Sequence, residues 1–326
     1  MMNRLLLSSV LMGAAFAVCA QTKPLLRIHT AGPNDLNVET TFMAVSFADA
    51  VNKASNSVEI KVFPASQLGQ TREVIEAMRL GSGAAGTTGG PAEYASFVKR
   101  LGVLGLPFLW KSFDHAYNVL NGPVGQELEK DMEKAGFKVL TWSVAWGYRN
   151  VVTARKEVKA PGDLKGLKIR TIPTKVFVAA INSMGANATP MNFGEIYTSL
   201  QSGVLDGYEH TAATTISFKF NEVACCIALT RHLMDPTFLV FSLPEWKKLS
   251  AKDQEILSRA AREVGLVVKN EASKRESDAL AKVKSLGMKV NEIDLAPLHK
   301  AAAGAQEELA REFDAQQLLE QIRKAN

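Results

Sequence analysis

The order in which strand and helix patterns follow one another constrains the fold most. From Leu25 onwards, the segments LLRIHTAG, VETTFMAVSFADAVNKAS and SVEIKVFP have the patterns of a strand, an amphipathic helix and a strand, and a second helix follows from Thr71. A similar succession starts again at residues 159–172 (KAPGDLKGLKIRTI), with helices that end at Gly185 and Gly203. Since alternating strands and helices are typical of mostly parallel sheets covered by helices, we expect two α/β units.

The late part of the chain contains one helical pattern that is much longer than the others, from Ala251 to about Leu286. Two α/β units and such a helix indicate two lobes with a cleft between them. We assign residues 24–147 and 236–275 to the first lobe and residues 148–235 and 276–326 to the second. Ligands bind such sheets where strand ends meet, so the cleft is the expected site.

The first 20 residues have the three parts of a secretory signal. Arg4 supplies a positive charge, Leu5 to Val18 is apolar or small, and Val18-Cys19-Ala20 offers small residues to a signal peptidase. The apolar run is shorter than the roughly 20 residues of a membrane span. Cys19 raises the alternative of a lipoprotein, but Val18 fits a lipid-attachment motif poorly. We therefore predict a signal peptide at residues 1–20, cleaved after Ala20, and export to a periplasm or the outside.

The charge of the chain does not indicate nucleic acid as a partner. The formal net charge of +5 is spread along the sequence, whereas nucleic-acid surfaces cluster Lys and Arg beside aromatic residues. The small positive balance favours an anionic ligand.

Two adjacent cysteines, Cys225 and Cys226, lie in the apolar segment EVACCIALT. A disulfide between neighbouring residues is strained, so we predict two buried free thiols. The cysteines indicate neither a disulfide framework nor a metal site.

The segment RLGSGAAGTTGGP contains Gly81, Gly83 and Gly86 in the spacing G-x-G-x-x-G of dinucleotide-binding loops. That loop follows a strand and opens a helix, whereas here the glycines follow the helical pattern TREVIEAM. The reversed order argues against a nicotinamide cofactor, and we predict no cofactor. We expect the segment to form a strand that lines the cleft, where the hydroxyls of Thr87 and Thr88 approach the ligand.

No catalytic motif points to an enzyme. The sequence has no G-x-S-x-G elbow, no H-E-x-x-H and no P-loop, and its five histidines are far apart. No catalytic residue and no metal ligand is therefore predicted.

Arg170 ends a strand that faces the cleft and can offer a planar fork to a carboxylate, although composition alone favours an ordinary surface salt bridge.

The region from Asp163 to His210 strongly resembles the signature of the DctP-type solute-binding proteins of TRAP transporters. The family pattern starts with KGLKIR and continues, after a helix, as G-A-x-P-x-P-M-x-F-x-E-V-Y-x-A-L-Q-x-G-V-V-D-G-x-E-N. This chain has KGLKIR at 165–170, Gly185-Ala186, PMNFGEIY at 190–197, LQSG at 200–203 and Asp206-Gly207. Two more segments, FPASQLGQTREVIEAMRLG and LPFLW, resemble family segments, so the resemblance covers essentially the whole mature chain.

The resemblance implies a two-lobed clamshell of the type II periplasmic-binding-protein kind, with a long helix spanning both lobes. It implies a periplasmic receptor, not an enzyme, that closes over an organic acid and delivers it to the membrane permease subunits of a TRAP transporter. A monomer is the expected state.

The resemblance also implies ligand-binding residues. The arginine of KGLKIR, which grips the ligand carboxylate in the family, is Arg170, and a second arginine matches Arg149 in WGYRNVVT. The phenylalanine that packs on the ligand is Phe193. In sialic-acid members an arginine after QLG also contacts ligand, and Arg72 occupies its position. The family's final asparagine is replaced by His210, which we expect to contact the ligand.

Aromatic and hydrogen-bonding residues beside these positions, Trp146 and Glu209 among them, suit a hydroxylated ring. We therefore favour a sugar acid such as glucuronate or galacturonate, with C4-dicarboxylates, keto acids and aromatic acids as alternatives. A secreted enzyme acting on organic acids, a receptor for a membrane kinase and an ABC-transporter binding protein are the rival classes.

Overall fold

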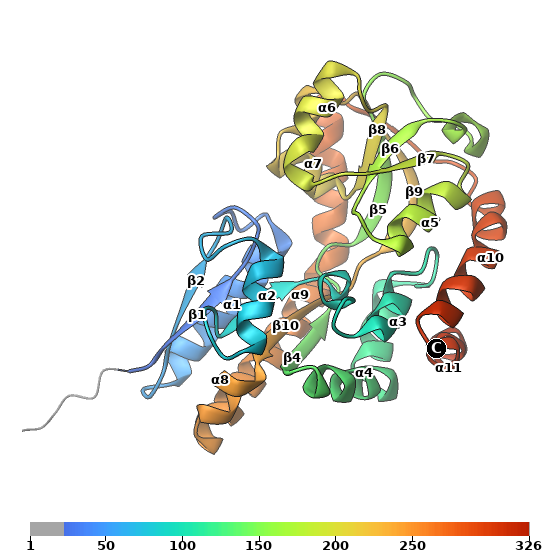
Figure 1. Cartoon of the computed structure of the whole chain (residues 1–326). Helices are drawn as coiled ribbons and strands as arrows, with labels where there is room; N and C mark the ends of the chain where they lie inside the picture. The colour runs from blue at the N-terminus through green and yellow to red at the C-terminus, as the bar shows by residue number, and fades with distance from the viewer. Residues whose placement is uncertain (1–22, 326) are drawn as a thin grey trace, which may run out of the picture.

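The protein has two α/β lobes, each built on one mixed sheet (Figure 1). This computed structural model describes residues 23–325. The first sheet has the order β2-β1-β3-β10-β4 and the second β11-β9-β5-β8-β6-β7. The strands are β1 Leu25–His29, β2 Glu59–Phe63, β3 Gly86–Gly89, β4 Phe137–Ser143, β5 Tyr148–Thr153, β6 Lys168–Thr171, β7 Asn187–Pro190, β8 Gly207–His210, β9 Cys226–Met234, β10 Thr237–Ser242 and β11 Lys289–Asn291.

Helices cover both sheets. They are α1 Glu39–Ala54, α2 Thr71–Arg79, α3 Phe113–Leu120, α4 Pro123–Lys134, α5 Lys175–Ser183, α6 Ile196–Ser202, α7 Ala212–Ser217, α8 Leu243–Lys248, α9 Ala251–Ser285, α10 Ala296–Glu312 and α11 Gln316–Lys324. Short 3-10 helices lie at Pro91–Tyr94, Lys99–Gly105, Pro161–Leu164, Phe193–Glu195 and Phe220–Glu222.

Each lobe is held by alternation along its central strands. On β10, Phe238 and Val240 pack into one hydrophobic cluster of the first lobe, and Leu239 and Phe241 pack into the other. All four side chains are fully buried, because helices cover both faces of the sheet.

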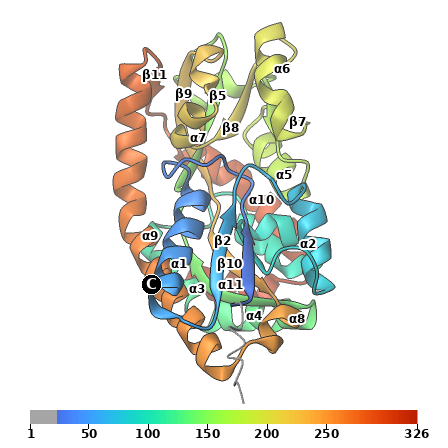
Figure 2. The same cartoon turned by 90° about the vertical axis from the view of Figure 1, so that its left-hand side faces the viewer.

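The long helix α9 spans both lobes, as the sequence predicts (Figure 2). Its first half packs on α1 and β4 of the first lobe, and its second half packs on α7 and β11 of the second. Ser250 caps its start by accepting a hydrogen bond from the backbone N–H of Asp253. The chain also crosses between the sheets twice, from β4 to β5 and from β9 to β10.

The sheets are less parallel than the strand–helix order predicts. β10 runs antiparallel to both β3 and β4, and β5 runs antiparallel to both β8 and β9. These exceptions are the strands next to the two crossings, where the chain enters a sheet from the other lobe and so runs against its new neighbours.

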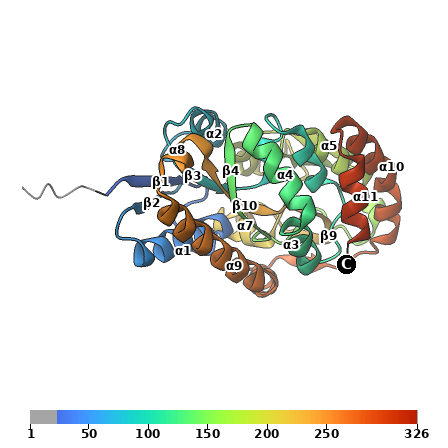
Figure 3. The same cartoon turned by 90° about the horizontal axis from the view of Figure 1, so that it is seen from below.

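The C-terminal segment departs from the predicted division into lobes. Residues 276–326 were assigned to the second lobe, but Leu318, Leu319 and Ile322 of α11 pack into the same cluster as Leu128 and Met132 of the first lobe. α10 contacts α5 of the second lobe, and the chain then returns along one side of the molecule to α4 (Figures 1 and 3). An amphipathic pattern shows that a helix buries one face and does not show which lobe that face meets.

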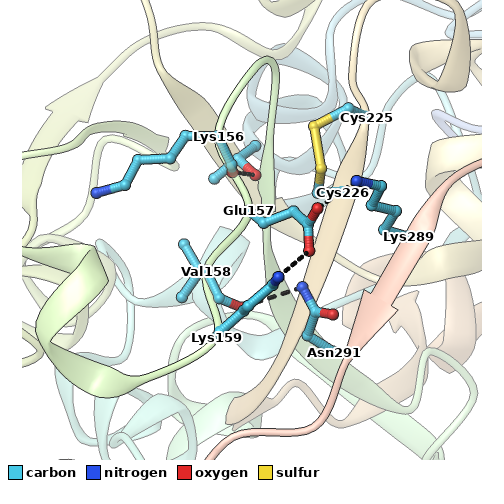
Figure 4. Close-up of a disulfide and its surroundings, with 9 residues drawn as sticks. Lys156, Glu157, Val158, Lys159, Cys225, Cys226, Lys289 and Asn291 are labelled. Atoms are coloured by element: carbon cyan, nitrogen blue, oxygen red, sulfur yellow. Dashed lines mark hydrogen bonds and ion pairs between the residues drawn. A yellow bond between two sulfur atoms is a disulfide. The ribbon is translucent and has the colours of Figure 1, made fainter.

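The prediction of two buried free thiols is wrong. Cys225 and Cys226 are joined by a disulfide at the start of β9, and only Cys226 is fully buried (Figure 4). The N–H of Cys225 donates to the carbonyl of Thr153, and its own carbonyl accepts from Lys289, so both neighbouring strands hold this backbone in place. The strain of a bond between neighbouring residues and the apolar flanking segment favoured free thiols, but neither prevents the bond here.

None of the helices within residues 23–325 is long and apolar enough to cross a membrane. The predicted signal peptide, residues 1–20, lies outside the described residues.

Candidate ligand-binding site

Arg170 is a buried cation that has no carboxylate partner among residues 23–325. It lies on β6, between β7 and β8, and only 2 % of it is exposed. Its Nε donates to the carbonyl of Met191 at 2.8 Å, while its Nη1 is buried and has no hydrogen-bond partner within residues 23–325. A buried charge is normally paired, because leaving water without compensation is unfavourable. The guanidinium is therefore prepared to meet an anion.

The aromatic side chain of Phe193 supports this guanidinium. The Arg170 Cζ lies 5.6 Å from the centre of the Phe193 ring, within cation–π range. Phe218 and Phe220 pack against the same ring, with centroids at 4.7 and 5.6 Å. The motif residues Arg170 and Phe193, which are far apart in the sequence, thus form one half of the site.

Burial lowers the pKa of Arg170 from 12.5 to about 10. The carboxylate of Glu209 raises it and the neighbouring Arg149 lowers it. Arg170 is still charged at neutral pH, and the lowered pKa means that its charged form is unfavourable in this environment.

Arg149 differs from Arg170 because it has its own carboxylate. Its Nε and Nη2 donate to the two carboxylate oxygens of Glu209 at 2.6 and 2.8 Å, in a bidentate pair. Both side chains are fully buried, and His232 Nε2 lies 3.6 Å from the same carboxylate. Burial raises the pKa of Glu209, but the charge and the hydrogen bonds of Arg149, together with the nearby His232 ring, outweigh it and bring the pKa to about 2.

His210 lies next to the Arg149–Glu209 pair. Its Nδ1 accepts the backbone N–H of Thr211 at 2.9 Å, and its pKa is held well below the ordinary value by burial and by Arg149. A neutral ring that accepts at Nδ1 carries its proton at Nε2. That Nε2 lies 3.4 Å from Nη1 of Arg149, the one nitrogen that Glu209 leaves free. Two donors so close together both need an acceptor, which a ligand oxygen can supply.

Trp146 lies beside the second half of the glycine-rich segment. A Cβ at Gly90 would lie 2.8 Å from Cζ3 of Trp146 and 3.1 Å from Oδ2 of Asp235, so only glycine permits this packing. This close approach explains the glycine at the end of the segment.

Three predicted residues are not brought to the arginines. Thr87 and Thr88 lie on β3, where their hydroxyls donate to the carbonyls of Thr88 and Thr40 inside the first lobe. The Arg72 side chain is 76 % exposed and pairs with Glu76 on the surface of α2.

Two buried carboxyl groups near Arg149, those of Asp235 and Glu39, carry no signal in the sequence that would predict them as site residues. The Asp-Pro pair at Asp235, between two apolar runs, marks a turn in the sequence, but nothing there shows that the turn meets Gly90. Within the described chain, no group of three or more His, Cys, Asp or Glu is arranged to hold a metal ion.

Two lobes joined by crossing strands, with an unpaired buried arginine on one of them, define a receptor that binds a small anionic solute. The chain belongs to family 7 of the bacterial extracellular solute-binding proteins, the DctP family, whose model matches residues 29–315. These proteins are the substrate-binding receptors of TRAP transporters and not enzymes, so the predicted family and class are confirmed.

A solute-binding protein of Verminephrobacter eiseniae is 34 % identical over 308 residues, which are 94 % of this chain and 90 % of that protein. Two solved TRAP periplasmic solute-binding proteins have the same fold, each with a TM-score of 0.86. The one from Chromohalobacter salexigens, with bound D-glucuronate, is 29 % identical, and the match covers 92 % of this chain and 100 % of that one. The one from Polaromonas, bound to D-erythronate, is 30 % identical, and the match covers 93 % and 99 %.

Proposed function

We propose that this protein is the periplasmic receptor of a TRAP transporter for a sugar acid such as glucuronate or galacturonate. The observation that carries the proposal is the guanidinium of Arg170, which is 2 % exposed and has an unpartnered Nη1. A ligand carboxylate would pair with it and remove the unfavourable energy of the isolated charge.

The remaining site residues take complementary roles. Arg149 Nη1 and His210 Nε2 donate to a second ligand oxygen, and Phe193 packs against the ligand while it supports Arg170. Glu209 contacts no ligand in this proposal; it holds Arg149 in place through the bidentate pair. Contacts from both lobes would favour a closed form, because only ligand-dependent contacts shift that equilibrium.

The ligand class is supported by the similar receptors. One binds D-glucuronate and another D-erythronate, and both ligands combine one carboxylate with several hydroxyls. Arg72, Thr87 and Thr88 remain predicted contacts, and the geometry described above does not favour them. Export through residues 1–20, delivery to membrane permease subunits and a monomeric state complete the proposal.

Isothermal titration of the purified protein with D-glucuronate, D-galacturonate, succinate and pyruvate tests the proposal. We expect one of the two uronates to bind at least tenfold more tightly than the other two acids. Arg170→Met should weaken that binding by about two orders of magnitude, because a charge-assisted pair is lost. The matched control is Arg27→Met, an exposed arginine on β1, which should bind like the wild type. Unchanged affinity of Arg170→Met would refute the proposed role of Arg170.

A further inference from the structure

Asp235 is a second buried ionisable side chain without a partner among residues 23–325, and it lies on the crossing from β9 to β10. It is 6 % exposed, and it makes no hydrogen bond or ion pair with another of residues 23–325. Fully enclosed polar atoms without a partner occur elsewhere in the described chain, but the Asp235 carboxylate oxygens are not fully enclosed. A small molecule can therefore reach them. Gly90 lies beside both this carboxylate and the Trp146 ring, since a Cβ at Gly90 would lie 3.1 Å from Oδ2 and 2.8 Å from Cζ3.

Asp235 does not serve as the counterion of Arg149. Arg149 lies near enough to lower the pKa of Asp235, yet its hydrogen bonds to carboxylates go to Glu209 alone. Burial dominates, and it raises the pKa of Asp235 to about 7. An internal partner would have reversed this shift, as it does for Glu209.

Two further carboxylates face the same region from the first lobe. Glu39, at the start of α1, is 4 % exposed and interacts with the charge of Arg149. Glu93 follows β3, interacts with the charge of Asp235 and packs its carboxylate on Gly89. Burial raises the pKa of Glu39 to about 7 and that of Glu93 to about 8, so both are only partly ionised at neutral pH. The first lobe and its connection therefore present carboxyl groups in a poorly solvated place, whereas β6 of the second lobe presents Arg170.

This arrangement favours a ligand that has a carboxylate at one end and hydroxyl groups at the other. A carboxylate oxygen accepts hydrogen bonds strongly from hydroxyl groups. A second carboxylate on the ligand would instead add a negative charge beside buried carboxyl groups whose own charged forms are already unfavourable, and this would weaken its binding.

We propose that Asp235 determines specificity by accepting a hydrogen bond from a hydroxyl of the bound acid and by excluding dicarboxylates. The proposal rests on the proposed function, because it assigns the opposite end of the same ligand. It names hydroxylated monocarboxylates as the substrate class.

Titration calorimetry with three ligands tests this role: D-glucuronate, D-glucarate as a dicarboxylate of similar size, and cyclohexanecarboxylate as a ring acid without hydroxyls. The wild type should bind D-glucuronate at least 100-fold more tightly than D-glucarate. Asp235→Ala should bind D-glucuronate about 10- to 100-fold more weakly than the wild type does, which is the range for loss of a hydrogen bond to a charged group. Its affinity for cyclohexanecarboxylate should be unchanged. Asp235→Asn keeps one acceptor, so it should lose less for D-glucuronate and should bind D-glucarate more tightly than the wild type does.

The matched control is Asp278→Ala, which removes an exposed carboxylate of α9 that pairs with Lys274. Thermal unfolding of each variant checks that it is folded. Equal losses for D-glucuronate and cyclohexanecarboxylate would mean that Asp235 acts on the connection between the lobes and not on a hydroxyl. Tighter wild-type binding of D-glucosaminate than of D-glucuronate would assign the acceptors to an ammonium group. Either result overturns the inference while the receptor function stands, whereas a wild type that binds no organic acid overturns both.

Discussion

Replacing Arg170 by Met should stabilise the ligand-free protein while it abolishes tight binding. The pKa of Arg170 falls from 12.5 to about 10, and each unit corresponds to about 1.4 kcal/mol, so burial of the charge costs about 3 kcal/mol. The variant loses the hydrogen bond to Met191 and the contact of the cation with Phe193, which contribute about 1 kcal/mol each. The expected net gain is about 1 to 2 kcal/mol.

The sign of this effect does not depend on pH in the usual range. An arginine whose pKa is lowered in the folded state destabilises that state at every pH below the folded pKa, here about 10. We therefore expect the unfolding midpoint of Arg170→Met at pH 7 to lie about 2 to 5 °C above that of the wild type. Urea unfolding should show the same order.

Adding ligand should reverse the order of stabilities. A ligand at 100 times its Kd stabilises the wild type by about 2.7 kcal/mol, whereas the variant should gain almost nothing at the same concentration. The control Arg27→Met should follow the wild type in both conditions. A loss of several kcal/mol in ligand-free Arg170→Met would show that Arg170 is an internally compensated structural cation, and the reasoning for the site would fail.

Two other substitutions and one labelling experiment test the remaining features of the structure. Glu209→Gln leaves Arg149 buried without its carboxylate, so urea unfolding should show a loss of about 3 to 5 kcal/mol. The wild type should lose the contribution of Glu209 as the pH falls from 4.5 toward about 2, because its folded pKa is lowered, and the variant should lack this phase in an acid titration; an unchanged phase would assign it to other carboxylates. His210→Asn should change the ranking of acids in a calorimetric panel with little change in unfolding midpoint, and an unchanged ranking would count against a ligand contact. Peptide mapping should find thiol labelling of Cys225 and Cys226 in the denatured protein only after reduction; labelling of either residue in the unreduced, denatured protein would contradict the disulfide.

Periodicity was sufficient for the parts of the fold that depend on neighbouring residues. The helix α9 begins at Ala251 and ends within a residue of the predicted end, since its amphipathic pattern and its serine cap are local. Strand β9 was missed, because its segment CIALTRHLM is buried almost throughout and has no regular alternation of apolar and polar residues to mark it.

The part of the site that comes from one sequence motif could be predicted from the sequence. Arg170 and Phe193 come from one motif, and the strand and helix between them bring the two side chains together. Asp235 and Gly90 approach each other across 145 residues, because β9 leads back to the first lobe beside the glycine-rich segment. No property of either residue in the sequence encodes that contact, so only the folded chain shows it.

Arg170 and Asp235 are buried without ion-pair partners among residues 23–325, and this makes the ligand-free site energetically unfavourable. Arg170 and Asp235 have opposite charge and are both buried, yet they do not pair with each other. If they did, a ligand would first have to break a buried ion pair, and much of its binding energy would be lost in that step. Held apart, the cation can take the carboxylate and the anion can take a hydroxyl, without prior rearrangement. The ligand-free protein is less stable for this reason, and the same instability becomes affinity when an acid with both groups binds.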